Sequence, residues 1–465
     1  MVLPSSPHSP GRVAAALAFT LALALTLALA VAGRSAGATV GGRLWVSRFH
    51  TPHVDQASDV AVNPNGSLVY VAGTSYRPGA YEDWVTLGLD PATGARVWTS
   101  RYDGPGHASD EANALAVGPD GARVYVAGTS YATSWNYTLI ACGAASGAQL
   151  WVARGLPGAA EDVAVAPDGA TVFVSGTGFG TAAYDASSGA KIWSRRYQPA
   201  GTTDGWANAV ALSPDGTHVF VTGYSHAQAS GDDYATVAYD AATGAAIWAR
   251  RYDGPGNGTD RAAALAVSPD GAGVYVTGTS DGAGSDPDSA ADWATIEYSA
   301  ATGAAIWSRR YDGPDHLADA ASALAVSPDG SRLYVAGSRE TAAGTDAATI
   351  AYDGATGATM WRRRYDGTAH LNDAARRLAV SPDGSTVFVA GSSEGAATSA
   401  DYLTIAYRAG AGTRLWARRY DGPGHSADQT SGVAVSPDGR RVLVTGGSFG
   451  AGTQADYATL AYGTS

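Results

Sequence analysis

The chain has 465 residues, more than an ordinary single domain, and it is rich in glycine (60) and in tryptophan and tyrosine (12 and 24), while only 15% of its residues are charged. Chains of long amphipathic helices need many Leu, Lys and Glu, and disordered chains lack aromatic residues, so this composition excludes both classes. A formal net charge of −12 argues against a nucleic-acid partner, and the single cysteine, Cys142, excludes an internal disulfide and any CxxC motif.

Residues 1–38 are expected to be an export signal. After Arg12 the chain has twenty uncharged residues through Ala32, followed by small residues that offer cleavage sites after Ala32 or Ala38. The run is also long enough to span a bilayer if it is not cleaved. We therefore expect a protein that is secreted or tethered to the cell surface, with residues 39–465 forming one domain.

The rest of the chain is a tandem repeat. A Pro-Asp-Gly or Pro-Asn-Gly turn occurs eight times, and tryptophan recurs at one place in each of eight copies, at intervals of 42 to 59 residues. The two counts agree on eight repeats. The repeated tryptophans are Trp45, Trp98, Trp151, Trp193, Trp248, Trp307, Trp361 and Trp416.

One repeat shows what each copy is expected to form. Residues 323–326 and 333–336 are β-rich runs joined by the turn 327–330, and residues 348–352 and 359–365 are two more, joined by the glycine-containing turn 353–357. Four short runs separated by turns predict a four-stranded antiparallel sheet.

Eight such sheets without a helical segment predict an all-β fold, the eight-bladed β-propeller. The domain begins with a lone fourth-strand segment, 43–49, and stops after a third-strand segment, 457–462. Because an unpaired strand edge is unfavourable, we expect the N-terminal strand to complete the last blade and to close the ring.

Two motifs carry a family resemblance. The run from Ala238 to Trp248, AYDAATGAAIW, resembles the tryptophan-docking motif of the quinoprotein-like (PQQ-like) propellers, and the Asp-Gly…Val-Tyr-Val-x-Gly runs resemble bacterial secreted propeller repeats of the YVTN and SBBP types. In eight-bladed quinoprotein dehydrogenases this resemblance implies a pyrroloquinoline quinone (PQQ) between a tryptophan and a vicinal Cys-Cys ring, with calcium beside it. Cys142 has no neighbouring cysteine, so we expect no PQQ here.

Residues that recur in most copies are expected to build the blades. The eight tryptophans are predicted to pack between neighbouring blades, with the indole N–H bonded to a turn carbonyl. Arginine pairs such as Arg250-Arg251 also recur. We expect one arginine of each pair to face solvent and the other to lie along the neighbouring blade, paired with a repeated aspartate such as Asp233, Asp292 or Asp401.

An aspartate precedes the first strand of most copies, as Asp110, Asp204, Asp260, Asp319, Asp373 and Asp428. It either caps the strand or belongs to a ring of carboxylates that binds a cation. Histidines in these loops are unevenly distributed around the ring. The loops that carry one enter blades 1, 2, 6, 7 and 8, which are neighbours in a closed ring. The candidate ligand-binding face comprises His53, His107, Asp110, His316, Asp319, His370, Asp373, His425 and Asp428.

Four of these histidines form His-x-x-Asp, and two or three converging loops would suit Zn²⁺ or a similar divalent cation. Duplication of the repeat would also produce the clustering without a function. The sequence has no G-x-S-x-G elbow and no H-E-x-x-H motif. We therefore expect a monomeric, non-catalytic scaffold that binds a protein, polysaccharide or small ligand; the alternative is a propeller enzyme of quinoprotein dehydrogenase-like or lactonase-like type.

Overall fold

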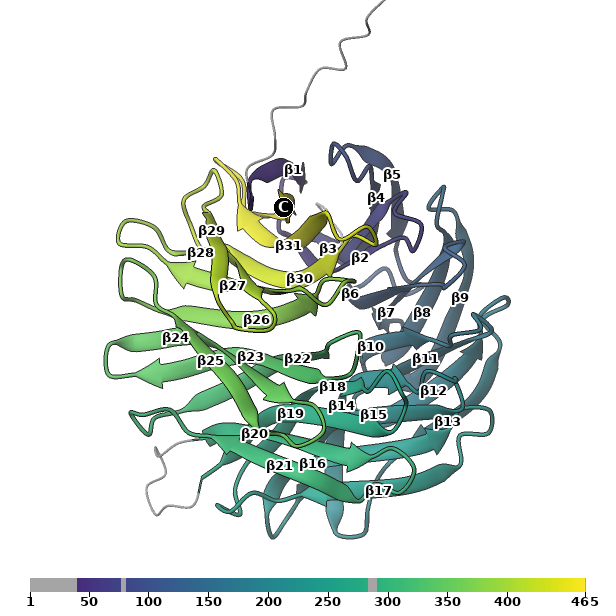
Figure 1. The fold of residues 1–465 in the computed structure, drawn as a ribbon. Helices are drawn as coiled ribbons and strands as arrows, with labels where there is room; N and C mark the ends of the chain where they lie inside the picture. Colours follow the sequence, from purple (N-terminus) through teal and green to yellow (C-terminus); the bar gives the residue numbers. More distant parts are fainter. Residues whose placement is uncertain (1–39, 77–80, 283–290, 465) are drawn as a thin grey trace, which may run out of the picture. The chain divides into compact units, whose positions relative to one another are not determined.

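The computed structural model describes residues 40–76, 81–282 and 291–464 (Figure 1). Their regular secondary structure consists of 32 strands in eight four-stranded antiparallel sheets, which confirms the predicted eight-bladed, all-β propeller. Among these residues no helix has the length and apolarity needed to cross a membrane. The predicted export signal, residues 1–38, lies outside the described part of the chain.

The first four blades follow one another along the chain. Blade 1 contains β2 (Asp55–Val62), β3 (Val69–Tyr76), β4 (Glu82–Leu89) and β5 (Arg96–Tyr102). Blade 2 contains β6 (Asp110–Val117), β7 (Arg123–Tyr131), β8 (Trp135–Gly143) and β9 (Gln149–Pro157). Blade 3 contains β10 (Ala160–Val165), β11 (Thr171–Gly176), β12 (Gly180–Asp185) and β13 (Lys191–Arg196), and blade 4 contains β14 (Thr202–Leu212), β15 (His218–Ala227), β16 (Gly231–Asp240) and β17 (Ala246–Tyr252).

The remaining blades continue this order until the last strand. Blade 5 contains β18 (Asp260–Val267), β19 (Gly273–Asp281), β20 (Ala291–Ser299) and β21 (Ala305–Tyr311). Blade 6 contains β22 (Asp319–Val326), β23 (Arg332–Thr341), β24 (Gly344–Asp353) and β25 (Thr359–Tyr365), and blade 7 contains β26 (Asp373–Val380), β27 (Thr386–Glu394), β28 (Ala400–Arg408) and β29 (Arg414–Tyr420). Blade 8 contains β30 (Gln429–Val435), β31 (Arg441–Phe449), β32 (Ala455–Gly463) and β1 (Arg43–Phe49).

The N-terminal strand closes the ring. β1 pairs antiparallel with β32, with Val46 opposite Leu460 and Phe49 opposite Tyr457. Blade 8 in turn packs against blade 1 through β30, β31 and β2. The first and last strands of the domain therefore share one sheet, as the two ends of the sequence predict.

The repeated tryptophans lie between blades. Trp248 Nε1 donates a hydrogen bond of 2.7 Å to the Ala300 carbonyl in the next blade's third turn, and its ring covers Gly303 of that turn. Gly303 has φ +68°, and a Cβ there would lie 2.6 Å from the indole, so only glycine fits. Six other tryptophans donate to the next blade in the same way, at 2.8–3.2 Å, and Trp416 covers Gly41 without a bond from Nε1 to any described residue.

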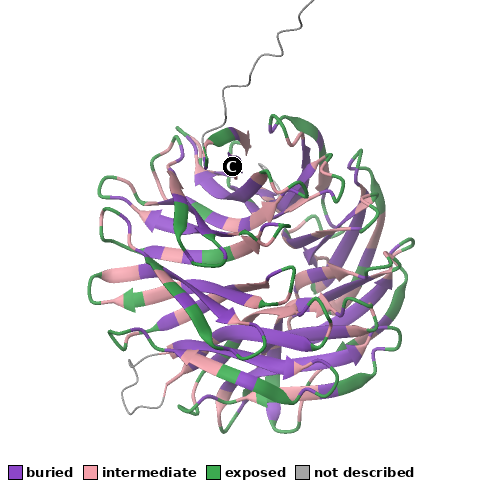
Figure 2. Ribbon diagram, viewed as in Figure 1, coloured by how far each residue is buried: buried purple, intermediate pink, exposed green. Residues whose placement is uncertain are grey.

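The hydrophobic core is divided among the interfaces between blades. The cluster between blades 4 and 5, for example, joins Phe220 and Trp248 with Val274, Ile296 and Tyr298. Figure 2 shows buried residues along the middle strands of the blades, while the loops are exposed. Each blade thus depends on two neighbours for its core, because a four-stranded sheet alone cannot bury both faces.

The arginine pairs differ from the sequence-based expectation. Arg250 lies along blade 5, where Nε donates to the Gly303 carbonyl at 2.8 Å, but it contacts no aspartate there. Arg251 forms the ion pair, and its partner, Asp233, belongs to the same blade. The prediction combined two roles in one side chain, because the alternation of a strand does not tell which sheet a side chain reaches. We call the first type cross-blade arginines: Arg195, Arg250, Arg309, Arg363 and Arg418.

Candidate functional site

The loops that join the fourth strand of one blade to the first strand of the next carry most of the candidate site; we call them junction loops. In the loop between blades 5 and 6, the His316 N–H donates to the Gly313 carbonyl at 3.1 Å and closes a turn. Asp319, at the start of β22, accepts the Gly313 N–H at 2.5 Å. The loop is therefore fixed by its own hydrogen bonds.

The histidine position in this loop has a left-handed backbone. His107, His316, His370 and His425 have φ between 44° and 53°, and Asn257 takes the same conformation, with φ 48°, between blades 4 and 5. Asparagine and histidine tolerate this region better than most residues. The four imidazole side chains are 73–79% exposed, so the loop presents each ring to solvent.

His53 does not share this geometry, although it lies in the equivalent loop between blades 8 and 1. Its backbone does not have a positive φ, and its ring packs edge-on against Tyr76 with 4.9 Å between ring centroids. The five histidines are thus four equivalent side chains and one different one. They lie in the consecutive junctions 5/6, 6/7, 7/8, 8/1 and 1/2. We call these five histidines the histidine sector.

The acidic partner of each of the four equivalent histidines lies four residues before it. The Nδ1–Oδ2 distances are 2.9 Å for His107 with Asp103 and 2.5 Å for His316 with Asp312. The other two pairs are His370 with Asp366 at 2.8 Å and His425 with Asp421 at 2.6 Å. The hydrogen bond to this aspartate raises the imidazole pKa of His107, His316 and His425.

The aspartate three residues after each histidine is buried and serves the backbone. Asp110, Asp319, Asp373 and Asp428 each accept the N–H of the loop glycine at 2.5–2.6 Å. Burial raises the carboxyl pKa of all four, that of Asp319 to about 6. Asp260 accepts Gly254 N–H in the same way, whereas Asp204 is exposed and accepts the N–H of Gly205 next to it.

These buried aspartates belong to groups of three carboxylates, one at each of five junctions, whose oxygen atoms lie within 4.8 Å of one another. In four groups the third-strand member is held by the second arginine of a pair, as in Arg310 Nη2–Asp292 Oδ2 at 2.8 Å, and in the fifth Asp83 is held by the single Arg101. The groups are Asp83/Asp103/Asp110, Asp233/Asp253/Asp260, Asp292/Asp312/Asp319, Asp346/Asp366/Asp373 and Asp401/Asp421/Asp428.

No histidine of the described residues belongs to a group of this kind. The structure therefore does not bring His316, His370 and His425 together around one ion, as the convergence of two or three loops would require. Sequence reasoning predicted Asp292 as an arginine partner but not as a member of such a group, and it missed the aspartate directly after the fourth strand, such as Asp312. The Tyr-Asp-Gly that recurs at the end of five fourth strands was the signal that could have identified Asp312.

The first strands line a central cavity of about 320 Å³. Alanine and serine make up seven of its sixteen lining residues, and the charged residues among the rest are Asp59, Glu161, Asp162 and Arg377. Asp162 accepts backbone N–H groups from Val163 and, in the next blade, Val210, each at 2.8 Å, and burial raises its pKa to about 7. These charges were not predicted; an acidic or basic residue inside a first strand of alanines was the available signal.

The cavity does not fit a planar quinone. Its described lining residues include no aromatic side chain on which such a ring could stack, and Asp162 uses its oxygens on the backbone. Cys142 lies buried in β8, 3.8 Å from Ser100 Oγ, and burial raises its thiol pKa. The absence of PQQ stays a prediction from the sequence.

Comparison with known proteins gives a family and a fold. The family model PQQ_2, described as outer membrane protein assembly factor BamB, matches residues 81–211, 136–293 and 294–455. The structure is similar to that of Sqt1 from Chaetomium thermophilum bound to the N-terminus of the ribosomal protein L10, with 14% identity, a TM-score of 0.62 and coverage of 91% of this chain and 100% of that one. It is also similar to BamB from Moraxella catarrhalis, with 14% identity, a TM-score of 0.51 and coverage of 91% and 100%. No curated protein sequence matches the chain.

Proposed function

We propose that this protein, which belongs to the PQQ_2 family described as outer membrane protein assembly factor BamB, is a non-catalytic scaffold. It binds a partner at its histidine sector. One observation carries the proposal. At each of these junctions a buried aspartate holds the loop glycine through one oxygen, whereas four imidazoles on the same fixed loops are 73–79% exposed. Side chains held in place but left in solvent are suited to recognition rather than to packing.

A protein is the partner we propose first. The similar propeller Sqt1 is bound to the N-terminus of the ribosomal protein L10 in its crystal structure, so a fold of this kind can bind the end of another chain. A polysaccharide or a small ligand is the alternative outcome. The loops of the sector provide imidazoles and carboxylates, which can donate and accept hydrogen bonds to any of the three.

The test replaces His316, His370 and His425 together by asparagine. Asn257 occupies the same left-handed position between blades 4 and 5, so asparagine should preserve the loop while removing the imidazole. Binding to arrays of purified proteins and of glycans should fall at least tenfold for the variant. Asn257→Gly, which alters the equivalent loop outside the sector, is the control and should bind like the unmutated protein. Equal binding by all three would reject the histidine sector as the binding face.

A divalent cation in the sector is also proposed. The carboxylate groups at junctions 1/2, 5/6, 6/7 and 7/8 supply the oxygen ligands that Ca²⁺ prefers, whereas Zn²⁺ would favour the imidazoles, which belong to none of these groups. Calorimetric titrations with CaCl₂ and ZnCl₂ at neutral pH separate the two. A Zn²⁺ signal lost in the triple asparagine variant would assign the ion to histidines, a Ca²⁺ signal retained there would assign it to carboxylates, and no signal with either would reject the cation.

Export to the cell exterior, with or without retention of residues 1–38 as an anchor, is proposed from the sequence. Mass spectrometry of the protein recovered from a secreting host should find an N-terminus directly after Ala32 or Ala38. We also propose that the protein is a monomer, which light scattering will check. An enzyme of quinoprotein or lactonase type is the rival; dye-linked oxidation of sugars or alcohols after incubation with PQQ and calcium, or lactone hydrolysis, would favour it.

A further inference from the structure

The cross-blade arginines define a repeated guanidinium site. In all five, Nε donates to the carbonyl of the turn glycine in the next blade at 2.7–2.8 Å, and Nη2 donates to the carbonyl just before that glycine at 2.6–3.2 Å. Nη1 donates to the carbonyl that precedes the arginine, at 2.6–2.9 Å. The guanidinium carbon also lies 5.8–6.0 Å from the centroid of the repeated tryptophan.

At the joint between blades 8 and 1 the arginine is replaced. Ser47 stands two residues after Trp45, where the five arginines stand after their tryptophans. The other parts of the site are in place: Trp45 covers Gly94 of the next blade's turn, and its Nε1 donates to Pro91 at 3.0 Å. Among the described residues, no donor reaches the carbonyls of Thr93 and Gly94.

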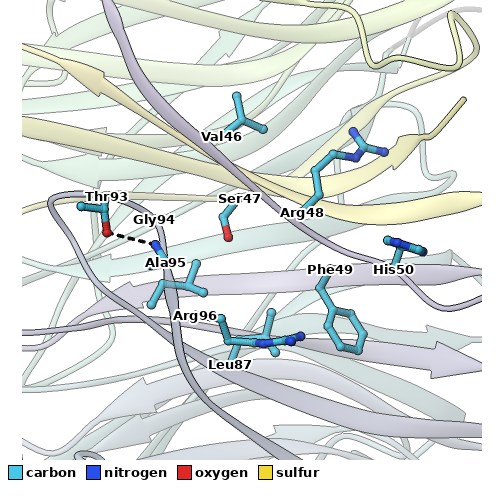
Figure 3. A pocket seen from close by; sticks show the side chains of 11 residues that line it. Val46, Ser47, Arg48, Phe49, His50, Leu87, Thr93, Gly94, Ala95 and Arg96 are labelled. Carbon is cyan, nitrogen blue, oxygen red and sulfur yellow. Dashed lines mark hydrogen bonds between the residues drawn. The ribbon is translucent and has the colours of Figure 1, made fainter.

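A pocket of about 500 Å³ opens at this joint. Val46 and Ser47 of β1 line it together with the turn Thr93, Gly94 and Ala95 of blade 1, as Figure 3 shows. The carbonyls of Val46, Thr93 and Gly94 correspond in sequence position to the three carbonyls that hold each cross-blade arginine. The pocket is thus the same site without its side chain.

The positive charge beside the pocket does not exclude a guanidinium. Of the two arginines that line the pocket, Arg48 is paired with Asp456 at 2.8 Å, and Arg96 lies over the ring of Phe49, 5.7 Å from its centroid. The joint between blades 7 and 8 has the same arrangement, with Arg43 over Tyr420 at 5.6 Å, and Arg418 nevertheless occupies the site there. That joint is a precedent within the molecule for two arginines side by side.

We propose that the pocket at the 8/1 joint binds a guanidinium group, supplied by an arginine side chain of a protein partner. The three carbonyls match a planar cation with several N–H donors, whereas a lysine ammonium is a point charge that cannot reach all three of them. The formal net charge of −12 favours the approach of a basic segment. The lining of the pocket includes none of the five histidines of the histidine sector, so this proposal and the proposed function are tested by different variants.

The probe is N-acetyl-arginine methylamide, followed by NMR of backbone amides, with the lysine analogue for comparison. The arginine probe should shift the amides of Ser47, Gly94 and Ala95 in a saturable way, and the lysine probe should bind at least tenfold more weakly. Ser47→Arg should fill the site from within and abolish these shifts. A short peptide with a central arginine should reproduce the shifts, since the partner is a protein.

The control is Ser100→Arg, which adds an arginine at the equivalent position of blade 1 and leaves the 8/1 pocket intact. The shifts at Gly94 should persist in this variant. Equal affinity for both probes, shifts that survive Ser47→Arg, or no shift at Gly94 would each overturn the proposal. A response to the free arginine derivative but not to the peptide would reject a protein source.

Discussion

The glycine that ends each third turn has a neighbour that leaves no room for a side chain, because the tryptophan of the preceding blade lies directly on it. Gly303 combines this contact with a positive φ, so the two requirements act on one residue. The pair explains why the Thr-Gly of the turn and the tryptophan recur together. Neither is useful to the interface alone.

Gly303→Ala should therefore destabilise the protein by about 2–4 kcal/mol, of which about 1 comes from the left-handed backbone and the rest from the clash with Trp248. Urea denaturation measures the change. Gly66→Ala is the control, since Gly66 has φ +74° but nothing within 4 Å of the added Cβ. It should lose only the backbone part; equal losses in the two variants would mean that the indole contact contributes nothing.

Asp319 should make stability fall as pH rises through the weakly acidic range. Burial raises the pKa of Asp319 from 3.8 to about 6 in the folded state. Between these two pH values the carboxyl is deprotonated in the unfolded chain but still protonated in the folded one. The free energy of unfolding therefore falls as the pH rises. Asp319→Asn should remove this loss, about 1–3 kcal/mol between pH 4 and 7. Denaturation at several pH values measures it.

Asp329→Asn provides a contrast of opposite sign. Hydrogen bonds, first from Ser327 Oγ, lower the pKa of the exposed Asp329 to about 2, so its contribution to stability is present above pH 4 and is lost as pH falls toward 2. Between pH 4 and 7 the Asp329→Asn variant should be less stable than the unmutated protein by an amount that does not depend on pH. A pH profile of Asp319→Asn that parallels the unmutated protein would contradict the role assigned to burial.

At the scale of the strand, two consecutive arginines have unequal tasks. Arg310 neutralises Asp292, which is nearly buried, whereas Arg309 donates only to backbone carbonyls at the outer edge. Arg310→Ala should cost about 2–4 kcal/mol because it leaves a buried charge unpaired, and Arg309→Ala about 1 kcal/mol. Thermal unfolding of the two variants tests the order; a larger loss for Arg309→Ala would reverse the assignment.

The strands and their arginines also show how much of the structure could be predicted from the sequence. Turn residues and alternating runs predicted the strands of the 323–365 repeat within a few residues, because those signals are local. The repeated aspartates, such as Asp233, were correctly predicted to pair with arginines, but the predicted reach to the neighbouring blade was wrong, because Arg251 pairs with Asp233 of its own sheet. Pairing within the sheet and pairing across the interface are equally compatible with alternation. The left-handed backbone of His316 and the position of Asp292 beside Asp312 depend on tertiary contacts and have no local signal.

At the scale of the whole molecule, the ring gives every blade two neighbours, and blade 8 is assembled from both ends of the domain. Its three C-terminal strands and β1 share one sheet, and Trp45 links that sheet to blade 1. The closing joint thus depends on residues more than 400 positions apart in sequence, such as Arg48 and Asp456, whose side chains lie 2.8 Å apart. Closure makes the interfaces interdependent, so a defect at this joint should be felt in the stability of the whole propeller.

Deletion of residues 43–49 tests this directly. The deletion exposes the edge of β32, removes Trp45 from Gly94 and leaves Asp456 without Arg48. An open edge pairs readily with other chains, and the lost core contacts alone amount to several kcal/mol, so the variant should melt at a lower temperature and aggregate. Calorimetry and light scattering measure both effects. Trp45→Ala, which keeps the strand, should lower the melting temperature without the aggregation that an open edge causes; an unchanged melting temperature after the deletion would show that the ring does not depend on β1.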